Sequence, residues 1–420
     1  MQTFVIFTPI MNIREIFEKS LSGLSKEVWI ISLLMLVNRA GLMVVPFLTI
    51  YLTDSLSFTL NQAGTAGFCF GLGSVLSSYA GGKLTDIFGY ANVMKFSLLS
   101  GGMAFWALLF FTDFYGFCIV IFLTAFLADL LRPAVMSSIT LFSKEENQTR
   151  ALSLLRIAIN LGISIGPIVG GLMITFLGYD WLFILNGGTA VVTFFMFLYF
   201  NRIMKVNRKT NNLKSHKNKD RFPIFDRGYL WLLLILFLMF TAFIQIIFLV
   251  PVFFKEVYFL SEIQVGTFFT INGLLIVVFE MPIVYYFETR KMFSKPIIAG
   301  STLMIIAFLA LLLPIEFSEI FWIVPFIIYT LAISIGEILN LPFLGSLALA
   351  RTTKDNSGSY MGLFALVTSC AFTVAPIIGT RIVSNYGFSQ LWLLCIVFLL
   401  ISNILYSKMR NKFLINEDYK

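Results

Sequence analysis

The sequence predicts an all-α polytopic membrane protein in which twelve transmembrane helices form two six-helix bundles related by a parallel repeat. Hydrophobic residues make up 58% of the 420 residues and charged residues only 12%, with a mean hydropathy of +0.89. Soluble domains carry about 25% charged residues, so this composition excludes a water-soluble enzyme. The apolar stretches are also unbroken over about 18 or more residues, as membrane helices require, whereas barrel strands alternate over about 10 residues.

Twelve apolar stretches are each long enough to cross about 30 Å of hydrocarbon as a helix. They lie near residues 28–52, 61–82, 94–112, 116–142, 150–177, 181–201, 228–254, 262–287, 295–314, 318–349, 357–383 and 387–407. The predicted units are an interfacial or cytoplasmic segment 1–27, a bundle 28–201, a basic cytoplasmic linker 202–227, a bundle 228–407 and a cytoplasmic tail 408–420.

The lysines and arginines predict the orientation of these helices. Of the 30 basic residues, 25 lie on the side of the two termini and only Lys255 and Arg381 on the other. Because basic residues accumulate in cytoplasmic loops, both termini are predicted to be cytoplasmic. The net charge of +8 then reflects membrane orientation, and nucleic acid is not expected as a partner.

The two halves of the sequence can be aligned with each other. At an offset of 209 residues Gly166-Pro167 falls on Ala375-Pro376 and Gly178 on Gly387, and at an offset of 202 residues Gly71 falls on Gly273. Duplicated bundles of this kind are a recurring transporter design, with the substrate site between the repeats. Both halves run in the same direction, so the predicted repeat is parallel.

Between the second and third stretches stands the motif Gly82-Lys83-Leu84-Thr85-Asp86-Ile87-Phe88-Gly89. It resembles G-x-L-x-D-x-x-G, the inner-loop signature of the major facilitator superfamily, and with the six-plus-six pattern the resemblance covers about residues 28–407. The resemblance implies that Gly82, Asp86 and Gly89 form a gating loop that latches the halves in the outward-facing state. The basic residues that the family usually has near Ile87 and Tyr90 are missing here.

The fifth stretch contains a glycine-rich motif made of Gly162, Gly166, Pro167, Gly170 and Gly171. It matches G-x-x-x-G-P-x-x-G-G, which is associated with the drug and metabolite antiporters of this superfamily. Glycines four residues apart let a neighbouring helix approach closely, and the proline bends the span; a plain packing face is the alternative. The resemblance to bacterial exporters implies a monomer in the bacterial inner membrane.

Six charged residues fall inside the predicted spans, where each costs about 3 kcal/mol or more unless it is paired or hydrated. They are Arg39, Asp129, Arg132, Arg156, Glu280 and Glu337. A carboxylate that moves between apolar surroundings and a nearby arginine changes its affinity for a proton. We therefore expect the three acids to be candidates for proton coupling, with a structural ion pair at i and i+3 as the alternative for Asp129 and Arg132.

The three arginines and four amide side chains are candidates for solute binding or for charge partners. The amides are Asn160, Gln245, Asn272 and Asn340. Ordinary hydrogen bonds between helices are the alternative for the amides, and for Arg156 the alternative is a structural link between spans four and five. All three arginines lie in the first half and two of the three acids in the second, which predicts a polarised cavity suited to a zwitterion or an amphipathic anion.

These features predict a proton-coupled secondary transporter that exports a small amphipathic or zwitterionic metabolite or drug by alternating access. An importer of peptide-like or carboxylate-bearing solutes, or a membrane receptor that transports nothing, is the alternative. The four cysteines and the single His216 form no catalytic or metal-binding spacing, and no G-x-x-x-x-G-K-[ST] motif occurs. No enzyme activity, metal or cofactor is therefore expected, and the proton gradient is the predicted energy source.

Overall fold

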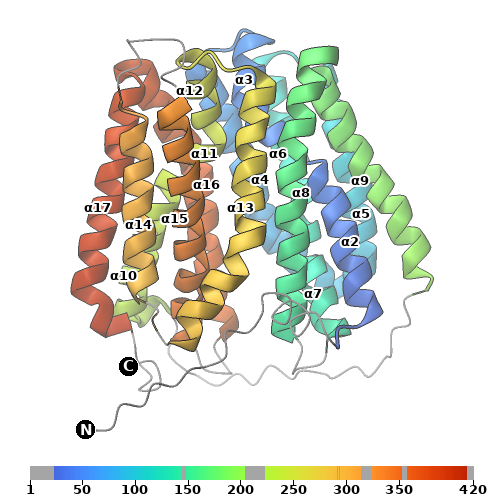
Figure 1. Cartoon of the computed structure of the whole chain (residues 1–420). Coiled ribbons are helices and arrows are strands. Elements are labelled where there is room, and N and C mark those ends of the chain that lie inside the picture. Colours follow the sequence, from blue (N-terminus) through green and yellow to red (C-terminus); the bar gives the residue numbers. More distant parts are fainter. Residues whose placement is uncertain are drawn as a thin grey trace.

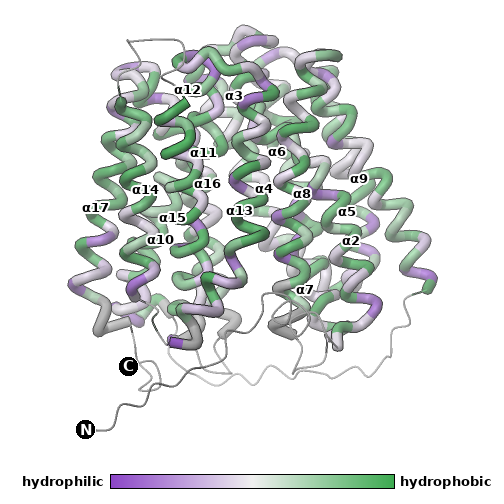
Figure 2. Tube along the Cα trace, viewed as in Figure 1, coloured by the Kyte–Doolittle hydropathy of each residue, from purple (hydrophilic) through white to green (hydrophobic). Residues whose placement is uncertain are grey.

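The computed structural model describes residues 23–143, 148–203, 223–290, 292, 294–313, 323–351 and 357–413, and every regular element in these ranges is a helix. Most of the predicted N-terminal segment, most of the linker and the end of the tail lie outside the described residues. Ten helical segments are long and apolar enough to cross a membrane, and Ser294–Ala310 is an apolar helix that is shorter. With the helix Leu60–Phe88 they correspond to the twelve predicted spans. Figure 2 shows hydrophobic residues predominating along the middle of the helices, as expected where helices face lipid.

The first six spans form one bundle and the last six another (Figure 1). The first bundle consists of α2 (Lys26–Ala40), α3 (Val44–Asp54), α4 (Leu60–Phe88), α5 (Tyr90–Ala107), the 3-10 turn η1 (Leu108–Phe110), α6 (Phe114–Asp129), α7 (Leu131–Phe142), α8 (Gln148–Leu177) and α9 (Asp180–Asn201). The second consists of η3 (Pro223–Phe225), α10 (Arg227–Phe243), α11 (Gln245–Phe248), α12 (Val250–Glu256), α13 (Glu262–Thr289), α14 (Ser294–Ala310), α15 (Ile323–Ala350), α16 (Ser357–Tyr386) and α17 (Phe388–Phe413).

Two faces of the molecule are distinguished below. At the linker face, α2 begins, α9 ends, α10 begins and α17 ends; at the opposite face, the far face, α3 and α12 end (Figure 1). The halves meet where α8 packs on α13, where α4 packs on α16, and where α3 packs on α11 and α12. The interface therefore combines the second and fifth spans of each half with the first span of each half.

The first and seventh spans are broken, although the sequence predicts them as continuous over 28–52 and 228–254. α2 ends at Ala40 and α3 begins at Val44, while the seventh span is interrupted at Ile244 and Leu249. In each broken span, the segment that ends at the far face has a proline in its first turn: Pro46 in α3 and Pro251 in α12. Proline has no N–H to donate to the preceding turn, so it favours a break at this position. The fourth span is likewise divided at Leu130, between α6 and α7.

Several spans are joined by very short turns. Gly89 alone links α4 to α5, and Gly387 alone links α16 to α17. Gly89, Gly178 and Gly387 have φ values of 78°, 93° and 90°, in the left-handed region that favours glycine. Gly178 and Gly387, which the internal repeat aligns, thus adopt the same conformation. The prediction of a loop at 82–89 is wrong, because α4 stays helical to Phe88 and only Gly89 forms the turn.

Candidate functional site

The two halves make close contacts through glycines in the part of the interface nearer the far face. A Cβ atom on Gly67 would lie 2.9 Å from the Pro376 side chain, and one on Gly266 would overlap the Pro167 backbone. Such spacing brings helix backbones close enough for tight packing. The pairs α4–α16 and α8–α13 are thereby closed on the side of the far face.

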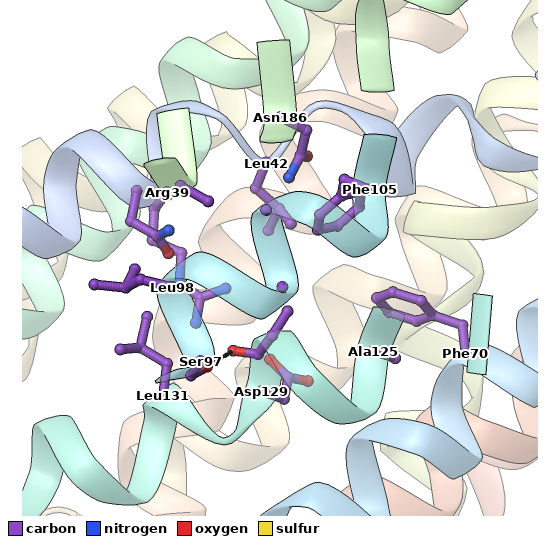
Figure 3. A pocket seen from close by; sticks show the side chains of 15 residues that line it. Arg39, Leu42, Phe70, Ser97, Leu98, Phe105, Ala125, Asp129, Leu131 and Asn186 are labelled. Atoms are coloured by element: carbon purple, nitrogen blue, oxygen red, sulfur yellow. Dashed lines mark hydrogen bonds between the residues drawn. The ribbon is translucent and has the colours of Figure 1, made fainter. Parts of the chain in front are cut away.

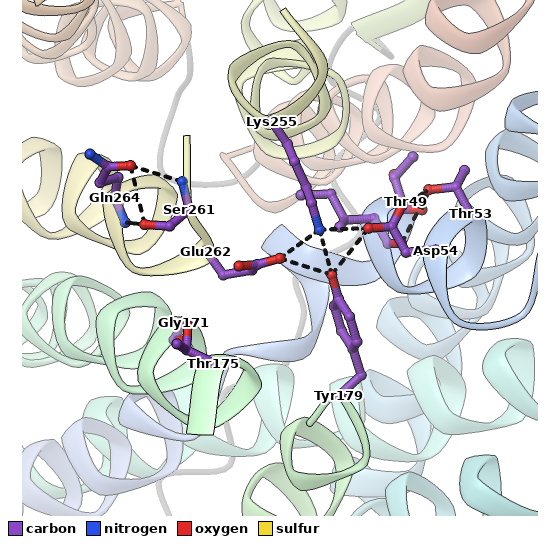
Figure 4. Close-up of polar contacts among 11 residues, drawn as sticks. Thr49, Thr53, Asp54, Gly171, Thr175, Tyr179, Lys255, Ser261, Glu262 and Gln264 are labelled. Carbon is purple, nitrogen blue, oxygen red and sulfur yellow. Dashed lines mark hydrogen bonds and ion pairs between the residues drawn. The ribbon is translucent and has the colours of Figure 1, made fainter. Parts of the chain in front are cut away.

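A network of four polar side chains, here called the far-face network, joins the halves above these contacts (Figure 4). Lys255 Nζ lies 2.5 Å from Asp54 Oδ2 and 2.5 Å from Glu262 Oε1, and it donates to the Tyr179 hydroxyl at 2.8 Å. Asp54 and Tyr179 belong to the first half, and Lys255 and Glu262 to the second. One ammonium group therefore holds both halves together at this face.

Electrostatics keep the far-face network in its charged form. Burial lowers the pKa of Lys255, but its hydrogen bonds to Asp54, Glu262 and Tyr179 raise it more, so the net pKa lies above the ordinary value. Burial raises the pKa of Tyr179 to about 12, although the hydrogen bond from Lys255 acts in the opposite direction. Lys255 is therefore an ammonium and Tyr179 a neutral phenol across the physiological range.

Two cavities lie between the halves. The Glu337 cavity has a volume of about 120 Å³ and is lined by Arg156, Asn160, Ile276, Glu280, Glu337, Ile338, Leu341 and Pro342. The Arg132 cavity has a volume of about 110 Å³ and is lined by Gly71, Ser74, Arg132, Phe240, Thr368, Ser369 and Phe372. Each cavity combines side chains from both halves, so each changes shape when the halves move.

The Glu337 cavity contains one arginine and two carboxylates. Arg156 of α8 forms an ion pair with Glu280 of α13, across the interface. Glu337 accepts a hydrogen bond from Asn272, and Asn272 also donates to Ser334 Oγ at 2.9 Å. Glu280 of α13 and Glu337 of α15 thus line the same cavity as Arg156, and the formal charges of these three side chains sum to −1.

The Arg132 cavity adjoins the ion pair that the sequence analysis gives as the structural alternative for Asp129 and Arg132. Arg132 Nε lies 3.1 Å from Asp129 Oδ1, and Asp129 Oδ2 accepts a short hydrogen bond from Ser74 Oγ. The Arg132 side chain is 54% exposed, whereas that of Asp129 is 9% exposed. The guanidinium group is therefore available on the cavity side, while the carboxylate stays inside the first bundle.

Arg39 lies in the last turn of α2, just before the break in the first span. It is within electrostatic reach of Asp129 and Arg132. A cation is favoured at a helix C-terminus because of the helix dipole, and this break places such a terminus inside the bundle. Arg39 thus adds a second cation beside one carboxylate, and the formal charge of Arg39, Asp129 and Arg132 is +1.

Two predicted amides lie elsewhere in the second bundle. Gln245 Nε2 donates to the Ala375 carbonyl of α16 at 3.0 Å. Asn340 Nδ2 donates to the Gly336 carbonyl within α15 at 3.0 Å and to Met304 Sδ of α14 at 3.6 Å. Neither residue lines the Glu337 or the Arg132 cavity. Both link helices of their own half, as in the alternative interpretation of these residues.

The glycine-rich motif of α8 packs against two different parts of the molecule. A Cβ atom on Gly162, Gly166 or Gly170 would meet the first span at Arg39, Leu42 or Met43. One on Gly171 would overlap the carbonyl oxygen of Glu262 in the other half. The motif therefore supports the break in the first span on one face and the closed far face on the other.

The predicted gating loop lies at the linker face. Gly82 has open space where a Cβ would stand, and Gly89 forms the turn. Asp86 is exposed, and no hydrogen bond or ion pair joins it to another described residue. Among the described residues, the predicted gating residue Asp86 thus makes no polar contact while the far face is closed.

The sequence reasoning missed the far-face network. A signal was available, because Lys255 is one of only two basic residues on its side of the predicted topology. Its partners were hidden because they lie 201 and 76 positions away in the sequence, at Asp54 and Tyr179.

Within the described residues, no group of three or more His, Cys, Asp or Glu side chains could hold a metal ion.

Comparison with known proteins agrees with this architecture. The sequence profile of the Major Facilitator Superfamily matches residues 28–365. The uncharacterized MFS-type transporter YttB of Bacillus subtilis (strain 168) is 23% identical over 377 residues, which cover 86% of this chain and 90% of YttB.

Solved structures share the fold at low sequence identity. A POT family transporter in complex with 5-aminolevulinic acid is 15% identical, with a TM-score of 0.75 over 91% of this chain and 96% of that one. A bacterial homolog of the human lysosomal transporter Spinster, in an inward-facing and occupied conformation, is 12% identical, with a TM-score of 0.72 over 93% of this chain and 98% of that one.

Proposed function

The chain belongs to the major facilitator superfamily, and from this premise we propose that it is a proton-coupled secondary transporter that exports a small amphipathic or zwitterionic solute. The solute binds between the halves, which rock about it so that the site opens to one side of the membrane at a time. The proton gradient drives this cycle, and no cofactor takes part.

The observation that carries the proposal is the ion pair between Arg156 and Glu280, with Glu337 in the same cavity. One arginine cannot neutralise two carboxylates, and an unpaired charge inside a membrane protein is costly. A proton on either acid removes that cost, and rocking of the halves separates Arg156 from Glu280. Proton binding and the movement of the halves are therefore linked through the same three side chains.

The charges around the two cavities support a zwitterionic solute. The group of Glu337, Glu280 and Arg156 has a formal charge of −1, and the group of Arg132, Arg39 and Asp129 has +1. A solute with a cationic and an anionic end is complementary to both groups. Phe240 and Phe372 in the Arg132 cavity provide apolar contacts for the rest of the solute.

The distribution of basic residues supports an orientation with both termini in the cytoplasm of a bacterium. The linker face is then cytoplasmic and the far face periplasmic. In this orientation the structure is closed toward the periplasm. This is the state from which an exporter collects its solute.

Purified protein in liposomes with an internal pH dye tests the proposal, with zwitterionic metabolites, dipeptides and amphipathic drugs as solutes. For right-side-out protein, proton efflux on addition of external solute supports antiport. The Glu280→Gln and Glu337→Gln variants test the coupling site, with the exposed carboxylate variant Asp180→Asn as the matched control. If both glutamine variants are folded and keep full proton-driven flux, neither acid is the coupling site.

A second candidate function is import of a carboxylate-bearing solute together with protons. The two arginines beside a single carboxylate, Asp129, favour it, because arginine binds carboxylates through paired hydrogen bonds. The same liposomes separate the two functions, since an importer gives proton influx together with solute uptake. Silence across the panel, with a control transporter active, contradicts both for the tested solutes.

A further inference from the structure

A third cavity lies inside the first bundle, and it is separate from the two cavities between the halves. It has a volume of about 40 Å³, and we call it the inner cavity. Figure 3 shows polar side chains from three helices around it: Arg39 of α2, Asp129 of α6 and Asn186 of α9. Most of the other lining residues are apolar, including Phe70, Leu98, Phe105 and Leu131.

Two buried polar atoms on this cavity have no hydrogen-bond partner. They are Arg39 Nε, a donor, and Asn186 Oδ1, an acceptor. Asn186 as a whole is only 6% exposed. A buried polar group without a partner costs about 1–3 kcal/mol, and here a donor and an acceptor without partners line the same small space.

We infer that the inner cavity is a binding site for ordered water, which accepts a hydrogen bond from Arg39 Nε and donates one to Asn186 Oδ1. A cavity needs only about 10–15 Å³ of space for the centre of a water-sized sphere to hold one water molecule. Buried waters make about three hydrogen bonds to polar groups that otherwise lack partners. The inner cavity meets both conditions. The carboxylate of Asp129 provides a further acceptor.

Other ligands fit the inner cavity less well. Its volume is only about a third of that of either cavity between the halves, and it lies inside one bundle, so a metabolite does not fit. A halide ion would be attracted by Arg39, but it would also face the carboxylate of Asp129 and the acceptor oxygen of Asn186. Water satisfies donors and acceptors together, so it matches this mixed lining.

The water site gives Asp129 hydrogen-bonding contact on a second side. Its two oxygens are engaged by Arg132 and Ser74, which both line the Arg132 cavity. Water in the inner cavity reaches the same carboxylate from within the first bundle. If Asp129 carries a proton during transport, which rests on the proposed function, that proton exchanges through water without passing the bound solute.

Radiolytic hydroxyl labelling of the protein in lipid nanodiscs tests the water site, because radicals formed from bound water modify the side chains beside it. The readouts are Phe105 and Leu98, which line the cavity and are 4% and 2% exposed. Phe117 and Phe183 are fully buried and do not line it, so they are the matched controls. We expect Phe105 and Leu98 to be modified several-fold faster than these controls.

Two variants sharpen the test. Asn186→Leu removes the acceptor, and Ala190→Leu fills the cavity from the same helix without changing a polar group. Either variant is expected to lower the labelling of Phe105 to the rate of Phe117. If neither variant folds, the labelling rates of Phe105 and Phe117 in the unaltered protein are sufficient to test the water site.

The proposal is overturned if Phe105 and Phe117 are labelled at equal rates. It is also overturned if replacing chloride by gluconate raises the labelling of Phe105, because the cavity then holds an anion. No solute or proton gradient is present in this experiment. Its result is therefore independent of whether the protein exports, imports or uses Asp129.

Discussion

Arg156 in the first half and Glu280 in the second form an ion pair across the interface, so one polar contact joins the two halves at this point. Both side chains line the Glu337 cavity. When the halves separate there, the two charges must find water, a proton or the solute. In the proposed transport cycle, the pair is thus a point at which solute binding and conformation affect each other.

The first prediction concerns this pair. Arg156→Ala leaves two carboxylates without a cation, and we expect proton-driven flux to fall by about tenfold or more, which corresponds to ~1.4 kcal/mol. The exchanged variant Arg156→Glu with Glu280→Arg restores the pair in reverse. We expect it to recover part of the flux, with a coupling energy of about 1–3 kcal/mol in the double-mutant cycle. Strictly additive losses would show that the contact does not matter for transport.

The second prediction concerns the far-face network. Lys255→Met leaves Asp54 and Glu262 as two like charges without a counterion, so we expect the far face to open. Spin labels at Ser55 and Glu256, in a variant without native cysteines, measure the distance between the halves at that face. The distance distribution is expected to shift to longer values.

Lys255→Arg is the control for this experiment, because it keeps the positive charge. Its distances are expected to stay close to those of the labelled protein with the native lysine. Unchanged distances in Lys255→Met would mean that the glycine contacts beneath the network are sufficient to hold the far face closed.

The third prediction concerns Gly171 of the glycine-rich motif. A methyl group there would overlap the Glu262 carbonyl oxygen across the interface, whereas a methyl group on Gly188 meets open space. We expect Gly171→Ala to reduce solute flux and to lengthen the distance between the spin labels, and Gly188→Ala to change neither. Equal behaviour of the two variants would contradict tight packing of α8 on α13 as a requirement for closure.

The fourth prediction concerns stability at low pH. Asp226 accepts hydrogen bonds from Arg351 Nε at 3.0 Å and Nη2 at 2.6 Å, at the linker end of the second bundle. Burial raises the pKa of Asp226, but the bonds from Arg351 and from the Tyr229 backbone lower it more, so the net pKa is below the ordinary value. We expect Asp226→Asn to cost about 3 kcal/mol at neutral pH, as for other buried pairs that lose one partner.

The sign of the pH effect follows from the lowered pKa. The contribution of Asp226 is fully present above the ordinary aspartate pKa of about 3.9 and is lost as the pH falls through the lower folded value. The difference in melting temperature between the unaltered protein and Asp226→Asn should therefore shrink in acid, as measured by thermal unfolding in detergent. Asp180→Asn, at an exposed position, should show little difference at any pH. A gap that stays constant in acid would refute the assignment.

Local sequence patterns were sufficient for the helices and for pairs within one helix. The length and hydropathy of the apolar stretches predicted the spans. The spacing of Asp129 and Arg132 indicated an ion pair as the alternative to proton coupling, and the structure shows this pair at 3.1 Å. Charged residues inside spans were also recognisable one by one, because apolar surroundings make them conspicuous. Each of these inferences depends on only a few consecutive turns of helix.

Contacts between distant helices could not be predicted in this way. Glu280 lies 124 positions after Arg156 in the sequence, so no helical periodicity relates them. The breaks before Pro46 and Pro251 were missed because continuous hydropathy conceals them. Gln245 and Asn340 looked like site residues because they are polar, but the helix face on which each lies depends on bundle packing. The inner cavity depends on packing in the same way.

The one-residue turns have a mechanical consequence. Gly89 and Gly387 connect their helices without a spare residue, so tilt in one helix of such a pair is passed directly to the next. We therefore expect the paired spans to move as stiff blocks and elastic deformation to concentrate in the interrupted first and seventh spans. A residue inserted next to Gly387 should therefore let α16 and α17 tilt independently of each other. The same insertion at Leu249 should mainly make the break in the seventh span more flexible.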